Sequence, residues 1–235
     1  MSDKYLLMWL EGPLQSWGDD SRFGRRESLP FPTKSGVFGL ICSARGAGGS
    51  QEDWLAEHRN VEMTVLAFSR NEKEKSTKQL RDFHTVGNGY DDTDPFQLLF
   101  IPKTSEGKTA VGGGTKITYR YYLQEACFAV VLKMDAAQCS SIAKAIQQPV
   151  WFTSLGRKNC VPSEWLYQGE FDSYEEAFNC ASDLGKDKNR FLSVLVKEGA
   201  YPDEGRVQTV NDVPICFGDE KKYEERYVTV ISEIC

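Results

Sequence analysis

A loop near the N-terminus combines an amide, an indole ring and three arginines. The amide of Gln15 can read the edge of a base, and the ring of Trp17 can stack on one. The guanidinium groups of Arg22, Arg25 and Arg26 can bind phosphate. Single-stranded RNA requires this chemistry. The Trp17 ring could equally be a core side chain that the loop covers.

A second candidate site lies at the start of an expected helix, at Lys34, Ser35 and Gly36. A helix N-terminus has unpaired backbone N–H groups and a partial positive charge, so it can receive a phosphate. Gly36 would allow close approach and Lys34 would add a full charge. The GxxxxGK spacing of a Walker loop is absent. The alternative is a glycine packed against the sheet and a lysine in solvent.

Two further segments contain polar groups of functional interest. His84, in the run from Leu80 to Val86, could act as a general base or could be a structural histidine at a strand end. Arg157 and Lys158, in a turn after the second long helix, could contact phosphate or could lie in a solvated loop.

The bulk composition limits the class of protein. The net charge of −6 argues against a free-standing, non-specific nucleic-acid binder. Yet the segment 22–45 carries five basic residues against one acid, whereas 201–235 carries eight acids against four bases. This asymmetry suits a protein that binds a polyanion on one face. The seven cysteines form no CxxC pair, so we expect neither a zinc knuckle nor a disulfide framework. We also expect no other metal and no cofactor.

Neither a membrane span nor an export signal is evident in the sequence. No stretch approaches the roughly 18 consecutive apolar residues that a transmembrane helix needs. The N-terminus lacks the basic and then apolar order of a signal peptide. We therefore expect a cytoplasmic protein without a membrane partner.

The pattern of apolar residues predicts an α+β fold. Strands are expected at 4–10, 61–67, 80–86 and 117–132, and helices after Ser35 and after Asp135. A further strand is expected at 166–171. The order βαβ, an insertion, and then βα fits a ferredoxin-like (RRM-like) domain at 1–170. The polar insertion at about 87–116, which contains Gly112-Gly113-Gly114, is expected to project from it.

The remaining residues, 171–235, are expected to form a small C-terminal β-rich subdomain. Ser173 and Glu176 have the spacing of a capping box at the start of an amphipathic helix. Strands are expected at 191–196 and 227–234, linked by a charged segment rich in turns.

Five motifs in this order resemble the CasD family, the fifth family of Cas proteins, in its type I-E Cascade form. They lie within 5–170 and are Gly12-Pro13-Leu14-Gln15-Ser16-Trp17-Gly18, Phe31-Pro32-Thr33-Lys34-Ser35-Gly36-Val37-Phe38-Gly39-Leu40, Leu80-Arg81-Asp82-Phe83-His84-Thr85-Val86, Tyr119-Arg120-Tyr121-Tyr122-Leu123 and Leu155-Gly156-Arg157-Lys158-Asn159-Cys160.

The resemblance implies a non-catalytic subunit of a CRISPR surveillance complex. Such a subunit binds the 5′ handle of the guide RNA (crRNA), sits beside the large subunit and meets target DNA through the guide. The insertion at 87–116 would be a thumb that packs on the adjacent backbone subunit and helps to kink the guide. The implied RNA-binding residues are Gln15, Trp17, Arg22, Arg25, Arg26, Lys34, Ser35, Gly36, His84, Arg120, Arg157 and Lys158.

Two other functions remain open. The chain could be a metal-independent endoribonuclease for repeat RNA, with His84, Lys116 and one of the nearby tyrosines, Tyr119, Tyr121 or Tyr122, as the catalytic groups. It could also be an unrelated ferredoxin-like protein that binds a small molecule or another protein, because such folds serve many functions.

Overall fold

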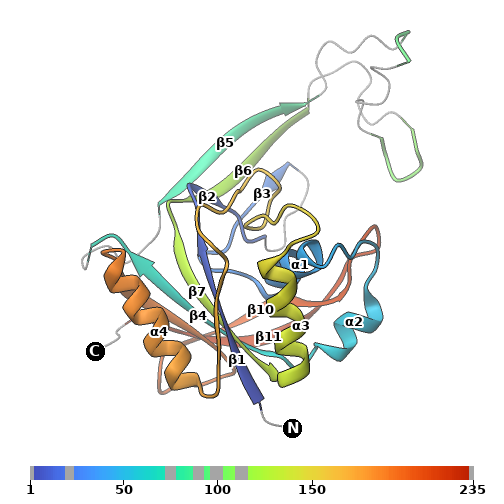
Figure 1. Ribbon diagram of the computed structural model, residues 1–235. Helices are drawn as coiled ribbons and strands as arrows, with labels where there is room; N and C mark the ends of the chain where they lie inside the picture. The colour runs from blue at the N-terminus through green and yellow to red at the C-terminus, as the bar shows by residue number, and fades with distance from the viewer. Residues whose placement is uncertain are drawn as a thin grey trace.

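The structure is a computed structural model that describes residues 3–18, 24–71, 78–86, 93–95, 103–108 and 116–232. Eleven strands and four helices occur in this part of the chain and confirm the α+β class (Figure 1). In order they are β1 (Asp3–Glu11), β2 (Leu14–Gln15), β3 (Arg25–Arg26), α1 (Lys34–Ala44), α2 (Glu52–Glu57), β4 (Glu62–Ser69), β5 (Gln79–Val86), β6 (Lys116–Gln124), β7 (Cys127–Asp135), α3 (Ala136–Gln147), β8 (Tyr167–Phe171), α4 (Tyr174–Asp187), β9 (Phe191–Glu198), β10 (Arg206–Cys216) and β11 (Lys222–Ile231). No helix among these residues has both the length and the apolar content that crossing a bilayer requires.

The main sheet contains seven antiparallel strands in the order β10-β11-β9-β4-β7-β1-β8. Its central strands β1 and β7 pair from Asp3↔Asp135 to Glu11↔Cys127. Both strands are nearly continuous apolar runs, because each is buried on both faces. Strands from both sides of residue 170 form this sheet, since β9 pairs with β4. The expected boundary at 170 therefore does not separate two sheets.

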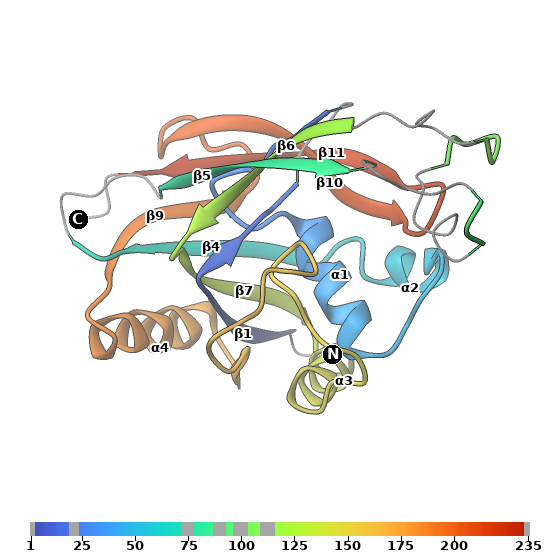
Figure 2. The same ribbon diagram turned by 90° about the horizontal axis from the view of Figure 1, so that it is seen from above.

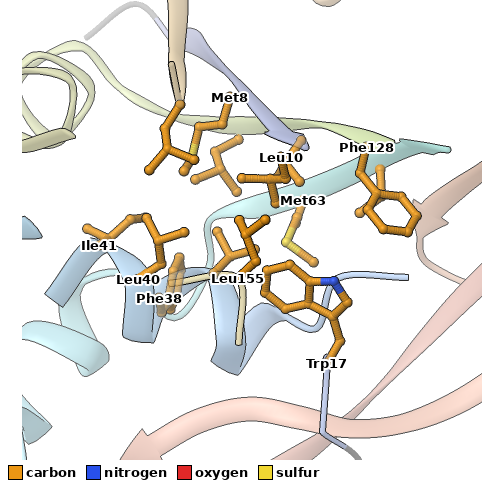
Figure 3. Packing of buried hydrophobic residues seen from close by; sticks show 14 of the residues in the cluster. Met8, Leu10, Trp17, Phe38, Leu40, Ile41, Met63, Phe128 and Leu155 are labelled. Carbon is orange, nitrogen blue, oxygen red and sulfur yellow. The ribbon is translucent and has the colours of Figure 1, made fainter. Parts of the chain in front are cut away.

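Helices cover both faces of the sheet. On one face, Met8 and Leu10 of β1 pack with Phe38 and Ile41 of α1, and α3 adds further apolar side chains (Figure 3). On the other face, Leu7 and Trp9 pack against α4. The sheet curls beyond β9, so β10 lies against the start of α1 (Figure 2). This curl brings the C-terminal strands close to the loops that were predicted from sequence to be functional.

Local sequence signals set the starts of two helices as predicted. The carboxylate of Asp135 accepts hydrogen bonds from the N–H groups of Ala137 and Gln138, at 2.9 and 3.0 Å, and so caps α3. The hydroxyl of Ser173 accepts from Glu176 N–H at 3.2 Å and caps α4. These contacts are local, which is why the sequence pattern found them.

The carboxylate of Glu11 is held at the end of β1. Trp9 Nε1 donates to one of its oxygens at 2.9 Å, and Arg190 forms a salt bridge with the other. Burial alone would raise the pKa of the Glu11 carboxyl, but these two hydrogen bonds and the charges of Arg190 and Lys188 outweigh burial and hold that pKa below its ordinary value. The interaction ties the start of β9 to the end of β1.

A second, smaller sheet forms an arm. β5 and β6 pair from Gln79↔Leu123 to Val86↔Lys116 and extend away from the main sheet (Figure 1). β2 and β3 pair with the other edge of β6. The predicted insertion at 87–116 therefore begins and ends on this arm. Its Gly112-Gly113-Gly114 lies outside the described residues, and its role as a thumb stays a prediction.

Two expected features of the strands are corrected. The strand predicted over 117–132 divides at Glu125, whose φ of 51° is left-handed, so β6 and β7 belong to different sheets. The segment predicted as a charged linker between 196 and 227 contains the eleven-residue strand β10. A bulge between Asn211 and Val213 interrupts the alternation of buried and exposed side chains along β10, so the sequence of this strand does not follow a regular period of two.

Candidate nucleic-acid interface

Five separate parts of the chain line one groove of about 610 Å³, which we call the interloop groove. The loop after β1, the strand β3, the start of α1 and the turn 154–160 form one wall, and the β10–β11 hairpin forms the other. Its described lining residues are Ser16, Gly18, Arg26, Thr33, Ser35, Gly36, Gly156, Arg157, Asn211, Phe217, Lys221 and Tyr223. Each charged residue in this set is cationic, so the groove suits an anion although the chain is acidic overall.

Backbone contacts preform the first wall. Ser16 N–H donates to Leu155 O at 3.1 Å, and Leu29 N–H donates to Trp17 O at 2.8 Å. Gly156 has a φ of +91°, and a Cβ there would lie 1.8 Å from Ser16 O. Only glycine can adopt this φ at such close range without strain. The turn 154–160 therefore rests directly on the loop after β1.

Arg157 joins the turn 154–160 to β3 and β6. Its Nη2 donates to Arg26 O at 2.8 Å and its Nη1 donates to Tyr121 O at 3.3 Å. Its guanidinium carbon lies 4.8 Å from the centre of the Tyr122 ring. A guanidinium has five N–H donors, so these two bonds leave capacity for a phosphate. The exposed Lys158 follows directly.

The predicted RNA contacts of Gln15 and Trp17 are corrected by burial, because neither side chain is exposed. Gln15 Nε2 donates to Leu10 O at 3.0 Å and to Ala126 O at 2.8 Å, and its Oε1 accepts from Trp17 Nε1 at 3.1 Å. Figure 3 shows the Trp17 side chain pointing into the core. Both residues therefore hold the loop in place.

Lys34 is corrected in the same way. Its side chain is 1% exposed, and its Nζ donates to Glu198 Oε1 at 2.9 Å and to Arg59 O at 3.3 Å. Burial lowers the pKa of the Lys34 ammonium group, and the charge of Glu198 partly offsets this. The Lys34 N–H donates to Asp212 Oδ2 at 2.6 Å, so a carboxylate of the chain itself already occupies the helix N-terminus.

Gly36 and Ser35 have different surroundings. A Cβ on Gly36 would lie 2.7 Å from Cε3 of Trp17, so the missing side chain makes room for the indole ring. This explains the glycine without a phosphate. Ser35 is half-buried and lines the groove. Its Oγ lies 3.4 Å from Oγ1 of Thr33.

The arm has two faces with different chemistry. Directly paired residues point to the same face, and successive residues alternate between faces. The register therefore places Asp82, His84, Thr118 and Arg120 on one face, and Arg81, Phe83, Tyr119 and Tyr121 on the other. His84 Nδ1 lies 3.8 Å from Asp82 Oδ2. Of the tyrosines proposed from sequence as catalytic partners of His84, Tyr119 and Tyr121 thus lie on the opposite face, and Tyr122 lies on the His84 face but is 2% exposed. The side chain of Lys116 lies outside the described part of the structure.

The two neighbouring arginines of β3 are separated as well. Arg25 lies by the Tyr121 face, with its guanidinium carbon 5.7 Å from the Tyr121 ring centre and a salt bridge of 2.9 Å to Glu27. Arg26 pairs with Arg120 and lines the interloop groove. Of the predicted residues, the structure thus brings Arg26, Ser35, Gly36 and Arg157 together, whereas Arg22 lies outside the described residues.

Sequence reasoning missed the second wall of the groove, which comprises Asn211, Phe217, Lys221 and Tyr223. The density of β-branched residues between Arg206 and Cys216 is a signal for a strand that could have been used. No sequence signal indicates that this strand reaches the start of α1, because the pairing that brings it there is long-range.

Comparisons with known proteins give consistent findings. The sequence matches the family described as "CRISPR-associated protein (Cas_Cas5)" over residues 5–229. A curated relative, the CRISPR system Cascade subunit CasD of Escherichia coli (strain K12), is 29% identical over 171 residues, which is 70% of each chain. A solved "CRISPR RNA-guided surveillance complex" contains a chain with a TM-score of 0.71 and 26% identity, which covers 97% of this chain and 89% of that one. A "Crystal structure of Cas protein" gives a TM-score of 0.60 and 25% identity, with 97% and 94% covered.

Proposed function

Because this chain belongs to the Cas5 family of CRISPR-associated proteins, we propose that it is a subunit of a type I-E Cascade complex and binds the 5′ handle of the crRNA in the interloop groove. The observation that carries this proposal is the groove itself. Its two walls bring Arg26, Arg157 and Lys221 to one space, and backbone contacts preform the wall that contains the two arginines. The names of the relatives, a Cascade subunit and an RNA-guided surveillance complex, support the same conclusion.

Electrostatics support an RNA partner over a neutral ligand. Arginine binds phosphate with paired N–H donors, and each phosphate that is neutralised releases counterions. The groove offers two arginines and a lysine, with the exposed Lys158 beside them. A protein of net charge −6 that concentrates cations at one groove suits one bound RNA segment better than general binding to nucleic acid.

The ferredoxin-like prediction is part of this proposal. The elements β1, α1, β4, β7, α3 and β8 occur in this order along the chain, as βαββαβ, with β2, β3, α2, β5 and β6 between them. Their strands lie in the order β4-β7-β1-β8 within one antiparallel sheet. This order is the one expected of a ferredoxin-like (split βαβ) fold and supports that part of the proposal. We infer that this core presents the groove and that the arm of β5 and β6 reaches the adjacent backbone subunit, with the large subunit on the handle side.

We also propose that the subunit has no catalytic step and reaches target DNA only through the guide. The register supports this, because it puts Tyr119 and Tyr121 on the face opposite His84, and Tyr122, which shares the His84 face, is only 2% exposed. General acid–base catalysis needs both groups at one reacting centre. Incubating the chain with repeat RNA in EDTA should leave the RNA intact. A discrete product that disappears in His84→Ala would instead assign an endoribonuclease.

Binding measurements test the proposed groove. The chain, alone and co-expressed with the other subunits, is titrated into labelled RNA carrying the handle of its own repeat, at several salt concentrations. We expect weak binding alone and tight binding in the complex, with the handle preferred over an unrelated RNA of equal length. Arg26→Ala should weaken binding and lower the slope of log affinity against log salt by about 0.7, the value for one phosphate of a single strand.

Arg206→Ala is the matched control, because Arg206 is exposed at the far end of β10 and is not among the groove residues. It should bind the handle as the unchanged chain does. Equal affinity for handle and unrelated RNA, or an equal effect of the two substitutions, would contradict the proposal.

A further inference from the structure

The second wall of the interloop groove has the chemistry of a base pocket. Asn211 on β10 and Tyr223 on β11 are both exposed and both line the groove. They line the same groove as Arg26 and Arg157. An amide, an aromatic ring and cationic groups thus surround one space of about 610 Å³, within the range of about 300–1,000 Å³ that is usual for ligand pockets.

A buried ion network fixes the position of Asn211. The register of β10 against β11 shifts between Asn211 and Val213, and Asp212 within this bulge is turned into the interior, where it is 2% exposed. Its carboxylate accepts from Arg226 Nε at 2.6 Å and from Arg226 Nη2 at 2.9 Å, as well as from the N–H of Lys34. Bulges commonly re-aim side chains next to functional sites. Here the bulge is anchored to α1, so Asn211 has a defined place in the groove.

The other end of the hairpin is anchored too. Phe217 N–H donates to Ser50 O at 2.8 Å, which holds the turn of the hairpin against the segment before α2. Tyr223 lies opposite Pro214 across the two strands. It therefore lies between two anchors of the hairpin, the Asp212–Arg226 ion pair and the Phe217–Ser50 hydrogen bond. The exposed Lys221 lines the same groove.

We propose that this wall receives one unstacked base of the bound RNA, with the ring of Tyr223 stacking on the base and the amide of Asn211 hydrogen-bonding to its edge. The phosphate of the same nucleotide lies at Arg26 and Arg157 on the facing wall. Single-stranded RNA is recognised by aromatic stacking and by hydrogen bonds to base edges. This inference rests on the proposed function and adds a base-reading site that lies in the C-terminal strands.

An abasic scan tests the pocket with the full chain. The probes are the labelled handle RNA and a series of the same RNA with one abasic site at each position in turn. For the unchanged chain, one abasic position should weaken binding about tenfold, a typical effect of losing one base–aromatic stack. Tyr223→Ala should weaken binding of the intact RNA by the same factor and should be insensitive to that one abasic site. Tyr223→Phe, which keeps the ring, should bind as the unchanged chain does.

Tyr227→Ala is the matched control, because Tyr227 is a 58% exposed tyrosine on the same strand that does not line the groove. Its affinity and its abasic profile should be unchanged. Asn211→Ala should reduce the discrimination between different bases at the sensitive position.

The outcomes separate the two proposals. If no abasic position weakens binding, or if Tyr223→Ala keeps the full abasic sensitivity while Arg26→Ala still weakens binding, the base pocket is wrong and the handle-binding groove stands. If neither Arg26→Ala nor Tyr223→Ala changes the affinity, the groove does not hold RNA and both proposals fail. The abasic scan of the unchanged chain can refute the pocket even if a variant does not fold.

Discussion

Replacing Lys34 by methionine separates the sequence-based role of this residue from its structural role. The motif at the start of α1 predicted Lys34 as a phosphate ligand, whereas the structure buries its ammonium group against Glu198 and Arg59 O. Methionine keeps most of the apolar stem and removes the charge. After the substitution, Glu198 keeps two donors, the N–H of Met63 at 3.0 Å and Arg226 Nη1 at 3.2 Å.

The size of the effect follows from these contacts. Breaking a buried ion pair costs about 3–5 kcal/mol, and losing one hydrogen bond to a charged group costs about 1.5–3 kcal/mol. Glu198 is 24% exposed and stays partly paired, which places Lys34→Met between these ranges, at about 2–4 kcal/mol of unfolding free energy. With an m-value of about 3 kcal/mol per M, the urea midpoint should fall by about 1 M.

Urea unfolding followed by tryptophan fluorescence measures this shift, because Trp9 and Trp17 are fully buried in the folded state. Lys158→Met is the control, since Lys158 is exposed and such a surface change should alter stability by about 0.5 kcal/mol or less. The two variants should have the opposite effects on handle binding: Lys158→Met should lower the slope of log affinity against log salt, and Lys34→Met should leave this slope unchanged. Equal urea midpoints for the two variants would refute the assignment of Lys34 to a buried ion pair.

Two further predictions follow from single contacts. Gly156→Ala should lower the free energy of unfolding by about 2 kcal/mol or more, because alanine is strained at positive φ and its Cβ would clash with Ser16 O. Gly18→Ala is the control and should be neutral in the same urea assay, because no atom lies within 4 Å of a Cβ at that position. The pKa of the Glu11 carboxyl lies below its ordinary value of 4.5, so the stability that this group contributes is present above pH 4.5 and is lost as the pH falls through the lower, folded-state pKa. Glu11→Gln should flatten this part of the profile of stability against pH, and an unchanged profile would refute the linkage.

The local elements could be predicted from the sequence because short-range physics determines them. The apolar run of β1, the helical face of α1 and the caps at Asp135 and Ser173 depend on residues a few positions apart. The polar insertion was located between β5 and β6 for the same reason, because its composition contrasts with the flanking strands. The family motifs likewise lie in continuous stretches.

The environment of each candidate side chain could be decided only by the tertiary structure. Gln15, Trp17 and Lys34 have the same chemistry whether they face RNA or the core, and their burial depends on partners as distant as Ala126 and Glu198. The wall with Asn211 and Tyr223 meets the start of α1 only because β9 pairs with β4 and the sheet then curls. The amino-acid types thus determined which groups are able to bind RNA. Long-range strand pairing determined which of these groups line the groove, because packing across the sheet, and not spacing along the sequence, places each side chain in the core or at the surface.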